Sequence, residues 1–356
     1  MGVPPGEPAR DKPWPIRLVA LLVMLLLSFA GATNQALAAE PPCTSQPGDR
    51  KPLAAATAPT LVPFKVSPFP YDGEIPAEHR KFLDYDKDGH RGHTSPRGNL
   101  HLEEEAYSDK NSLLYMPKGF DLSRPERALI VVFFHGNNAE LMRDVVGRQH
   151  IPQQLAQSGL NAALVAPQFA LGIPDSSAGW FWQPDIFRQY LAEAAHHLAV
   201  LHGGCSEAIF GRLRVVLVAY SGGYDPAAYV LDGGGANERL RGVVLLDALY
   251  GETDKFTNWI EHRGTAFFFS AYSQSSRAEN TALRNSLTVQ NGEVNPKSHL
   301  QLTGNSVRFL YAGPGIEHKD FMTLAWTRDP LARVLAAIDG YPIDRRYRSA
   351  PPPRRP

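Results

Sequence analysis

One serine stands where a nucleophile would project from a sheet. Ser221 comes at the end of the apolar run 215–219 and its following tyrosine, and Gly222 and Gly223 come next. A sharp strand-to-helix turn exposes a serine hydroxyl, and small neighbours let the backbone take that strained turn. The usual pattern begins with glycine, and here it begins with Ala219. Taken alone, the pattern also fits a glycine-rich turn at the start of a helix.

An acid and a base follow two later apolar runs. Asp247 closes the run 243–246, and His318 lies in a short loop with glycines after the run 307–311. A histidine can accept the proton of a serine hydroxyl, and a carboxylate can hold the imidazole in the required orientation. Asp247 alternatively caps a helix or forms a turn, and Glu279 is the next candidate for its role. With 12 histidines in the chain, His318 is alternatively an ordinary surface residue.

Backbone donors are expected close to Ser221. The apolar run 128–134 is followed by a glycine-containing turn that includes Asn137. Its N–H groups, together with that of Gly222, would hold the oxyanion of a tetrahedral intermediate. The alternative is a simple strand-to-helix turn in which Asn138 caps the next helix.

The elements that position these residues alternate between apolar runs and helical patterns. Uniformly apolar runs are typical of strands covered on both faces, and the alternation predicts an α/β fold: a mostly parallel sheet with helices on both sides. In such a sheet the active groups lie beyond the carboxyl ends of the strands. Two more strands, 100–102 and 112–116, are expected to pair with each other. The expected strands are 128–134, 162–166, 215–219, 243–246, 266–270 and 307–311, and the expected helices are 139–158, 184–202 and 256–262.

The chain order Ser221, Asp247, His318, with His135-Gly136-Asn137-Asn138 upstream, resembles the α/β-hydrolase fold family over about residues 98–340. The resemblance implies that Ser221 is the nucleophile, that His318 is the general base and then acid, and that Asp247 orients the imidazole. In most members the acid follows the next strand along, so the position of Asp247 departs from the usual one. The chemistry requires no metal and no organic cofactor.

Aromatic residues lie near the expected nucleophile. Trp180 and Trp182 belong to an insertion after the expected strand 162–166, and Tyr220 directly precedes Ser221. Such side chains could form a lip that binds an acyl chain, an aromatic acid or a sugar face. The alternative is that they pack on the edge of the sheet. We take these three as candidate substrate-binding residues.

The N-terminus has the layout of a secretory signal peptide. Arg10, Lys12 and Arg17 precede the apolar run 18–32, and small residues follow up to position 39. The run is shorter than the roughly 20 residues of a membrane-spanning helix. The sequence therefore predicts a signal peptide at residues 1–39 and an exported protein, periplasmic or secreted, with an uncleaved membrane anchor as the alternative.

The rest of the chain divides into three expected parts. Residues 40–97 begin with a stretch rich in Pro, Ala and Thr and are expected to be flexible or irregular. Residues 98–340 form the expected catalytic domain, and residues 341–356 form a disordered tail rich in Pro and Arg. The two cysteines, Cys43 and Cys205, would both lie in the exported protein, where they either pair or remain thiols.

A competing signal lies before the expected domain. The segment 84–89 matches the first half of a calcium-binding loop, but the twelfth position is Ser95 rather than Glu. A solvated charged loop is the favoured interpretation. The alternative is a metal site made from Asp86, Asp88, His90 and His93.

Composition narrows the classes of function. The 36 basic residues balance the 36 acidic ones, which gives no reason to expect a nucleic acid partner. We expect an exported serine hydrolase that cleaves a carboxylic ester of a small molecule or a polymer, without a cofactor. The alternatives are a non-catalytic binding protein on the same scaffold and a calcium-dependent interaction module. Ester, thioester, amide and polyester cleavage share this machinery, so the sequence leaves the substrate open.

Overall fold

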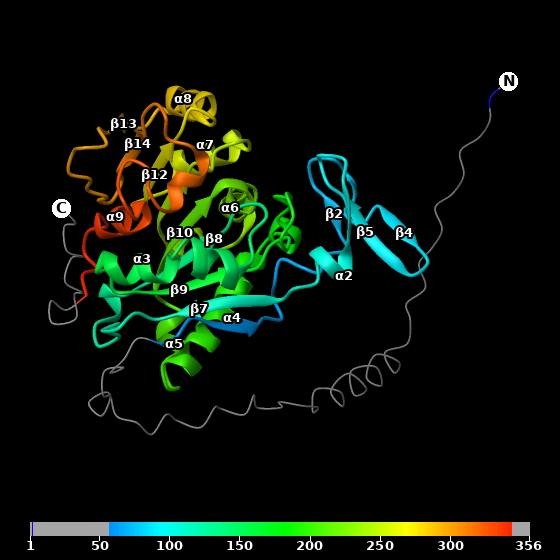
Figure 1. The fold of residues 1–356 in the computed structure, drawn as a ribbon, viewed down its shortest axis with the longest axis horizontal. Coiled ribbons are helices and arrows are strands. Elements are labelled where there is room, and N and C mark those ends of the chain that lie inside the picture. Colours follow the sequence, from blue (N-terminus) through cyan, green and yellow to red (C-terminus); the bar gives the residue numbers. More distant parts are fainter. Residues whose placement is uncertain (1, 3–56, 344–356) are drawn as a thin grey trace. The chain divides into compact units, whose positions relative to one another are not determined.

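The computed structural model describes residue 2 and residues 57–343 (Figure 1). Its main element is a nine-stranded sheet in the order β1-β7-β9-β8-β10-β11-β12-β14-β13. All neighbouring pairs from β9 to β13 are parallel, whereas β7 runs antiparallel to β9 and to β1. The predicted mostly parallel sheet is thus confirmed. The strands are Thr60–Pro63 (β1), Asn111–Tyr115 (β7), Leu129–Phe134 (β8), Ala162–Pro167 (β9), Arg214–Tyr220 (β10), Leu240–Leu246 (β11), Phe267–Tyr272 (β12), Gly292–Glu293 (β13) and Val307–Tyr311 (β14).

Helices cover both faces of this sheet. Successive side chains of a strand point to opposite faces, so each buried strand supplies two separate cores. In β8, for example, Ile130 and Val132 belong to one core, and Val131 and Phe133 belong to the other. The first core is covered by α4 (Ile186–Leu201), α6 (Tyr224–Gly233), α7 (Thr253–His262) and α8 (Arg277–Ser286), and the second by η2 (Leu141–Arg148), α3 (Ile151–Ser158) and α9 (Pro330–Ala336).

The expected helix 139–158 is wrong as a single element. It consists of a π-helical segment, η2, and the α-helix α3, with a break at His150, whose φ of 53° is left-handed. Pro152 then stands in the first turn of α3, where its missing N–H is tolerated. The other two expected helices are confirmed as α4 and α7, with shifted ends.

Regular structure begins well before residue 98, which corrects the expectation for residues 40–97. β1 pairs with β7 in the main sheet, and the segment that follows forms two small antiparallel sheets. Phe64, Phe69 and Phe82 of this segment are buried in the first core. The strands of the two small sheets are too short to show a hydrophobic period in the sequence. They are Glu74–Ile75 (β2), Arg80–Lys81 (β3), Tyr85–Lys87 (β4), His90–Thr94 (β5) and Leu100–Leu102 (β6).

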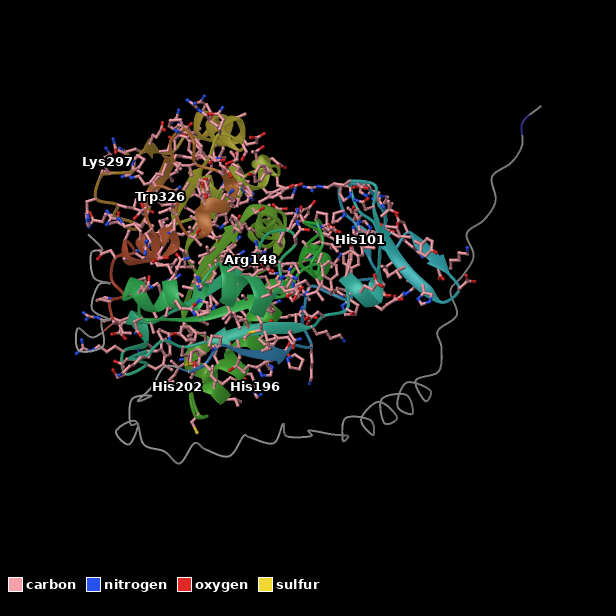
Figure 2. The ribbon with its side chains drawn as sticks, viewed as in Figure 1. His101, Arg148, His196, His202, Lys297 and Trp326 are labelled. Carbon is pink, nitrogen blue, oxygen red and sulfur yellow. The ribbon has the colours of Figure 1, made fainter. Side chains whose placement is uncertain are left out.

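The expected pairing of 100–102 with 112–116 is also wrong. β6 pairs with β5 in the small three-stranded sheet, on which His101 is labelled in Figure 2. β7 instead pairs with β1 and β9. The short helix α2 (Glu103–Ala106) lies between β6 and β7, so the polar segment that connects them is not the turn of a hairpin.

The segment 84–89 is part of a β-hairpin. Asp88 and Gly89, with φ of 55° and 83°, form the turn between β4 and β5. Asp-Gly is a preferred pair for two-residue hairpin turns because both positions need positive φ. Within the described part of the chain, no group of three or more His, Cys, Asp and Glu side chains is arranged to hold a metal ion.

Some predictions fall outside the described residues. These are the signal peptide at 1–39, Cys43 with its pairing to Cys205, and the tail beyond residue 343. Across residues 57–343, none of the helices has the length and apolar character needed to cross a membrane.

Candidate active site

The three predicted side chains meet at the carboxyl ends of β10, β11 and β14. His318 Nε2 lies 2.7 Å from Ser221 Oγ, and His318 Nδ1 lies 2.7 Å from Asp247 Oδ2. Both distances are within hydrogen-bond range. The parallel sheet brings residues nearly 100 positions apart to one edge, so a continuous hydrogen-bonded chain runs from serine to imidazole to carboxylate.

Ser221 occupies a strained turn between β10 and α6. Its φ is 55°, which is left-handed and uncommon for a residue with a side chain. The short helix η4 (Ser221–Gly223) begins at this residue. A Cβ atom at Gly136 would lie 2.5 Å from the Ser221 Cβ, so the approach of the two turns requires glycine there. The turn therefore has the backbone conformation expected of a nucleophile elbow.

Asp247 is completely buried and surrounded by hydrogen-bond donors. Burial alone would raise its pKa, but the donors outweigh burial and lower the pKa to about 2. The side chain is therefore a carboxylate at neutral pH. The donors are His318 Nδ1 at 2.7 Å, Ser276 Oγ at 2.5 Å, the Ser273 N–H and Oγ at 2.9 Å each, Tyr250 OH at 3.2 Å and Ser275 Oγ at 3.3 Å.

These serines come after the strand next to that of Asp247. They follow β12, the strand that carries the acid in most members of the family that the sequence resembles. In this chain the segment after β12 instead donates hydrogen bonds to Asp247, which follows β11. Glu279, the reserve candidate, lies on α8, and the imidazole pairs with Asp247 instead.

The imidazole of His318 is fixed from several sides. The Tyr220 ring stacks on it with centroids 5.0 Å apart and planes at 16°, and the Tyr220 hydroxyl donates to the His318 carbonyl at 3.3 Å. Glu317 and Asp320 form a capping box around the short helix η6 (His318–Met322). Tyr250 OH lies 3.1 Å from His318 Nδ1. These contacts hold the loop that carries His318.

The two residues proposed for the oxyanion hole are neighbours. A Cβ atom at Gly222 would lie 2.2 Å from Asn137 Oδ1, so their turns touch. Asn137 Oδ1 accepts a hydrogen bond from Ser176 Oγ at 2.9 Å. His135 is buried, and its Nε2 accepts the Phe169 N–H at 2.9 Å. Burial lowers the pKa of His135 to about 4, so a neutral ring braces the turn before Asn137.

The three aromatic candidates lie in different places. Tyr220 packs against His318, as described above. Trp180 is 39% exposed, and its Nε1 donates to the Pro70 carbonyl at 2.7 Å. Trp182 is buried and lines a pocket that also includes Asn137. Trp182 thus shares a pocket with a residue proposed for the oxyanion hole.

This pocket, which we call the side pocket, has a volume of 270 Å³. Its walls come from the N-terminal segment 75–97, the turn 174–177 and the start of α6. Sequence reasoning missed most of it because these segments are far apart in the chain and the first was expected to be irregular. Its polar and aromatic lining includes Glu78, His93, Arg97, Asn137, Asp175, Ser176, Ser177, Trp182, Tyr224, Asp225, Tyr229 and Glu252.

Comparisons with known proteins give limited matches. No family model matches the sequence, and a search of curated proteins finds no match. Among solved structures, a feruloyl esterase module from Clostridium thermocellum bound to sinapinate is 15% identical, with 74% of this chain and 95% of that chain covered and a TM-score of 0.40. Dienelactone hydrolase from Anabaena variabilis is 16% identical, with 64% and 87% covered and a TM-score of 0.35.

Proposed function

We propose that this protein is a serine hydrolase that cleaves a carboxylic ester through an acyl-enzyme on Ser221. The observation that carries the proposal is the hydrogen-bonded chain from Ser221 Oγ through His318 to Asp247, with 2.7 Å at each step. An imidazole between a serine hydroxyl and a buried carboxylate is the arrangement that activates a serine for acyl transfer.

The chemistry follows from the positions of these atoms. Ser221 Oγ attacks the ester carbonyl carbon while its proton passes to His318 Nε2. Asp247 holds the Nδ1–H and stabilises the imidazolium. The backbone N–H groups of Gly222 and Asn137 bind the oxyanion. The intermediate then expels the alcohol, which takes the proton from Nε2, and a water molecule repeats the sequence to release the acid and free Ser221.

Labelling with a fluorophosphonate probe tests the proposal. We expect the folded protein to be labelled and to hydrolyse short acyl esters, and we expect Ser221→Ala to lose both properties. Ser298→Ala, at an exposed serine, is the matched control and should behave as wild type. Labelling that persists in Ser221→Ala would place the nucleophile elsewhere. A folded wild type that is neither labelled nor active would instead favour the non-catalytic binding protein.

Export is a separate part of the proposal. It is supported by the basic, apolar and small-residue segments within positions 10–39. N-terminal sequencing of the protein recovered from outside the cytoplasm should begin at Ala39 or Glu40. A mature protein that retains residues 1–38 would support the uncleaved anchor.

A further inference from the structure

The side pocket adjoins the nucleophile. Asn137 and Ser176 belong to its wall, and both lie within a methyl group's distance of Gly222: a Cβ there would be 2.2 Å from Asn137 Oδ1 and 2.6 Å from Ser176 Oγ. On its other side Tyr224 packs against Tyr250, with ring centroids 6.2 Å apart, and Tyr250 contacts His318. A group bound in this pocket would therefore lie next to the turn that carries Ser221.

The pocket presents more acceptors than free donors. The Ser176 hydroxyl already donates to Asn137 Oδ1, and the Ser177 hydroxyl donates to Asp175 Oδ1 at 2.7 Å. Two further carboxylates, Asp225 and Glu252, belong to the lining. Glu252 Oε2 pairs with Lys255 at 2.6 Å. Of the other charged lining residues, Glu78 pairs with Arg80, and Arg97 is exposed.

His93 provides an independent sign that a donor is needed there. Its side chain is fully buried, and Nδ1 lies 2.6 Å from the Phe82 carbonyl, so Nδ1 carries the proton and Nε2 is an acceptor. This Nε2 has no hydrogen-bond partner, and it lies 3.8 Å from Asp175 Oδ2, which already accepts the Tyr107 hydroxyl at 2.6 Å. Burial lowers the pKa of His93, which favours the neutral ring. A ligand N–H or O–H placed between them would satisfy Nε2.

Asp225 adds an uncompensated acid. Its Oδ2 accepts the Trp182 Nε1–H at 3.1 Å, and no ion pair forms with it among the described residues. Burial and the nearby Glu252 raise its pKa to about 8, and the charge of Lys255 offsets only part of this rise. The rings of Trp182, Tyr224 and Tyr229 line the same space, and Lys255 Nζ already lies 4.6 Å from the centroid of the Tyr229 ring. Aromatic faces combined with carboxylates attract cations.

We propose that the side pocket binds a protonated amine on the ester substrate, so that this hydrolase prefers esters that carry an ammonium group. The proposal rests on the hydrolase function proposed above. An ammonium group has three donors and no acceptor, which matches the free acceptors of Asp225 and His93 and the excess of carboxyl groups. A sugar or other polyol would also need donors, and the Ser176 and Ser177 hydroxyls already donate to Asn137 and Asp175.

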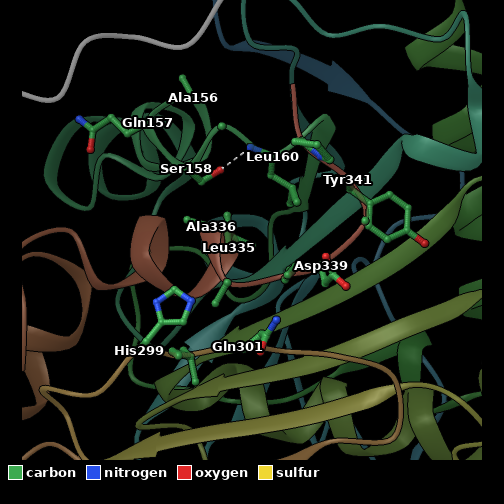
Figure 3. A pocket seen from close by; sticks show the side chains of 16 residues that line it. Ala156, Gln157, Ser158, Leu160, His299, Gln301, Leu335, Ala336, Asp339 and Tyr341 are labelled. Atoms are coloured by element: carbon green, nitrogen blue, oxygen red, sulfur yellow. Dashed lines mark hydrogen bonds between the residues drawn. The ribbon is translucent and has the colours of Figure 1, made fainter. Parts of the chain in front are cut away.

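A second cavity offers no comparable site. It has a volume of 420 Å³ and lies between the end of α3, residues 299–301 and the segment after α9 (Figure 3). Leu160 precedes β9 and Gln301 precedes β14, so this cavity is at the amino ends of the strands, opposite Ser221. Its lining includes few charged groups, and we draw no proposal from it.

The experiment compares esters that differ in one group. On the alcohol side the series is 4-(aminomethyl)phenyl acetate and 4-(hydroxymethyl)phenyl acetate, and on the acyl side it is the 4-nitrophenyl esters of 4-(aminomethyl)benzoate and 4-methylbenzoate. At pH 7 we expect kcat/KM to be at least tenfold higher for the ammonium ester in one of the two pairs. Asp225→Asn should reduce that ratio at least fivefold. Asp254→Asn, a matched change at an exposed carboxylate outside the pocket, should leave the ratio unchanged.

The outcomes separate the two proposals. The amine-pocket proposal would be overturned if the uncharged esters were hydrolysed as fast as the ammonium esters. It would also be overturned if Asp225→Asn left the ratio of their kcat/KM values unchanged. Either result would leave the proposed hydrolase function standing. A folded protein that hydrolyses no ester and escapes fluorophosphonate labelling would overturn the hydrolase instead. As a readout besides activity, 4-methylbenzylammonium should bind Ser221→Ala in calorimetry and lose affinity in Ser221→Ala with Asp225→Asn. The absence of any heat from 4-methylbenzylammonium would also count against the amine pocket.

Discussion

Two aspartates near the serine have opposite surroundings. Asp247 is completely buried, yet donors from His318, Ser273 and Ser276 hold its pKa at about 2. Asp225 has one donor, Trp182 Nε1, and burial together with nearby Glu252 raises its pKa to about 8. The difference teaches that donor supply, rather than burial alone, decides which buried acid is ionised. At neutral pH Asp247 is an anion, whereas Asp225 is largely neutral until a cation binds beside it.

The largest expected effect comes from removing the anion. We expect Asp247→Asn to lower kcat/KM for a short acyl ester by about 10³–10⁴-fold, because an amide favours the wrong imidazole tautomer. Fluorophosphonate labelling rates should fall in parallel, while circular dichroism should show a folded protein. A loss below tenfold would contradict the role of Asp247, and Glu279→Gln would then be tested in its place.

The next effect comes from removing one donor to the anion. Ser276→Ala deletes the 2.5 Å hydrogen bond to Asp247 Oδ1 and should cost about 1–3 kcal/mol of unfolding free energy. Because the folded pKa of Asp247 lies below its ordinary 3.8, its stabilisation is present above that value and is lost as pH falls toward 2.

The dependence of the unfolding free energy on pH in the acid range tests this prediction. In Ser276→Ala the pKa of Asp247 should rise toward its ordinary value, so urea unfolding measured between pH 2 and 5 should show a smaller loss of stability with falling pH than in wild type. Ser298→Ala is the control. A pH dependence that matches wild type would show that the other donors suffice.

At Asp225 the stability of the folded protein should change with pH in the opposite direction. Its folded pKa of about 8 lies above the ordinary 3.8, so the folded state binds the proton more tightly and loses stability as pH rises between these values. Asp225→Asn removes this loss. We expect its Tm to match wild type near pH 4 and to exceed it by roughly 2–4 °C or more at pH 8. Equal melting temperatures across this range would refute the raised pKa.

The smallest effect is expected at Tyr250. Its hydroxyl lies 3.2 Å from Asp247 Oδ2 and 3.1 Å from His318 Nδ1, and its hydrogen bond to the carboxylate is longer than those from His318, Ser273 and Ser276. Tyr250→Phe should therefore lower kcat/KM only about two- to tenfold. Steady-state kinetics of Tyr250→Phe and Asp247→Asn, measured with the same ester, compare the two losses of kcat/KM. A loss as large as that of Asp247→Asn would make Tyr250 an equal partner.

The sequence was most informative about residues that directly follow a predicted strand. The positions of Ser221, Asp247 and His318 could be predicted because apolar runs mark the strands, and the carboxyl ends of parallel strands share one edge. The donors Ser273 and Ser276 could not be assigned, since serines after a strand look like any turn until the neighbouring strand is placed beside them. The side pocket was missed for a related reason: its wall at 75–97 belongs to strands of two to five residues, too short for a detectable period.

The placement of β1 has a consequence for shortening this protein. A chain that starts at residue 98, where the recognisable hydrolase pattern begins, would lack the strand that covers the free edge of β7. It would also lack Phe64, Phe69 and Phe82 and leave their partners in the first core exposed to water. An uncovered edge strand beside bare apolar surface promotes self-association. The boundary for expression therefore belongs before Thr57, ahead of the first described contact with the sheet at Met116.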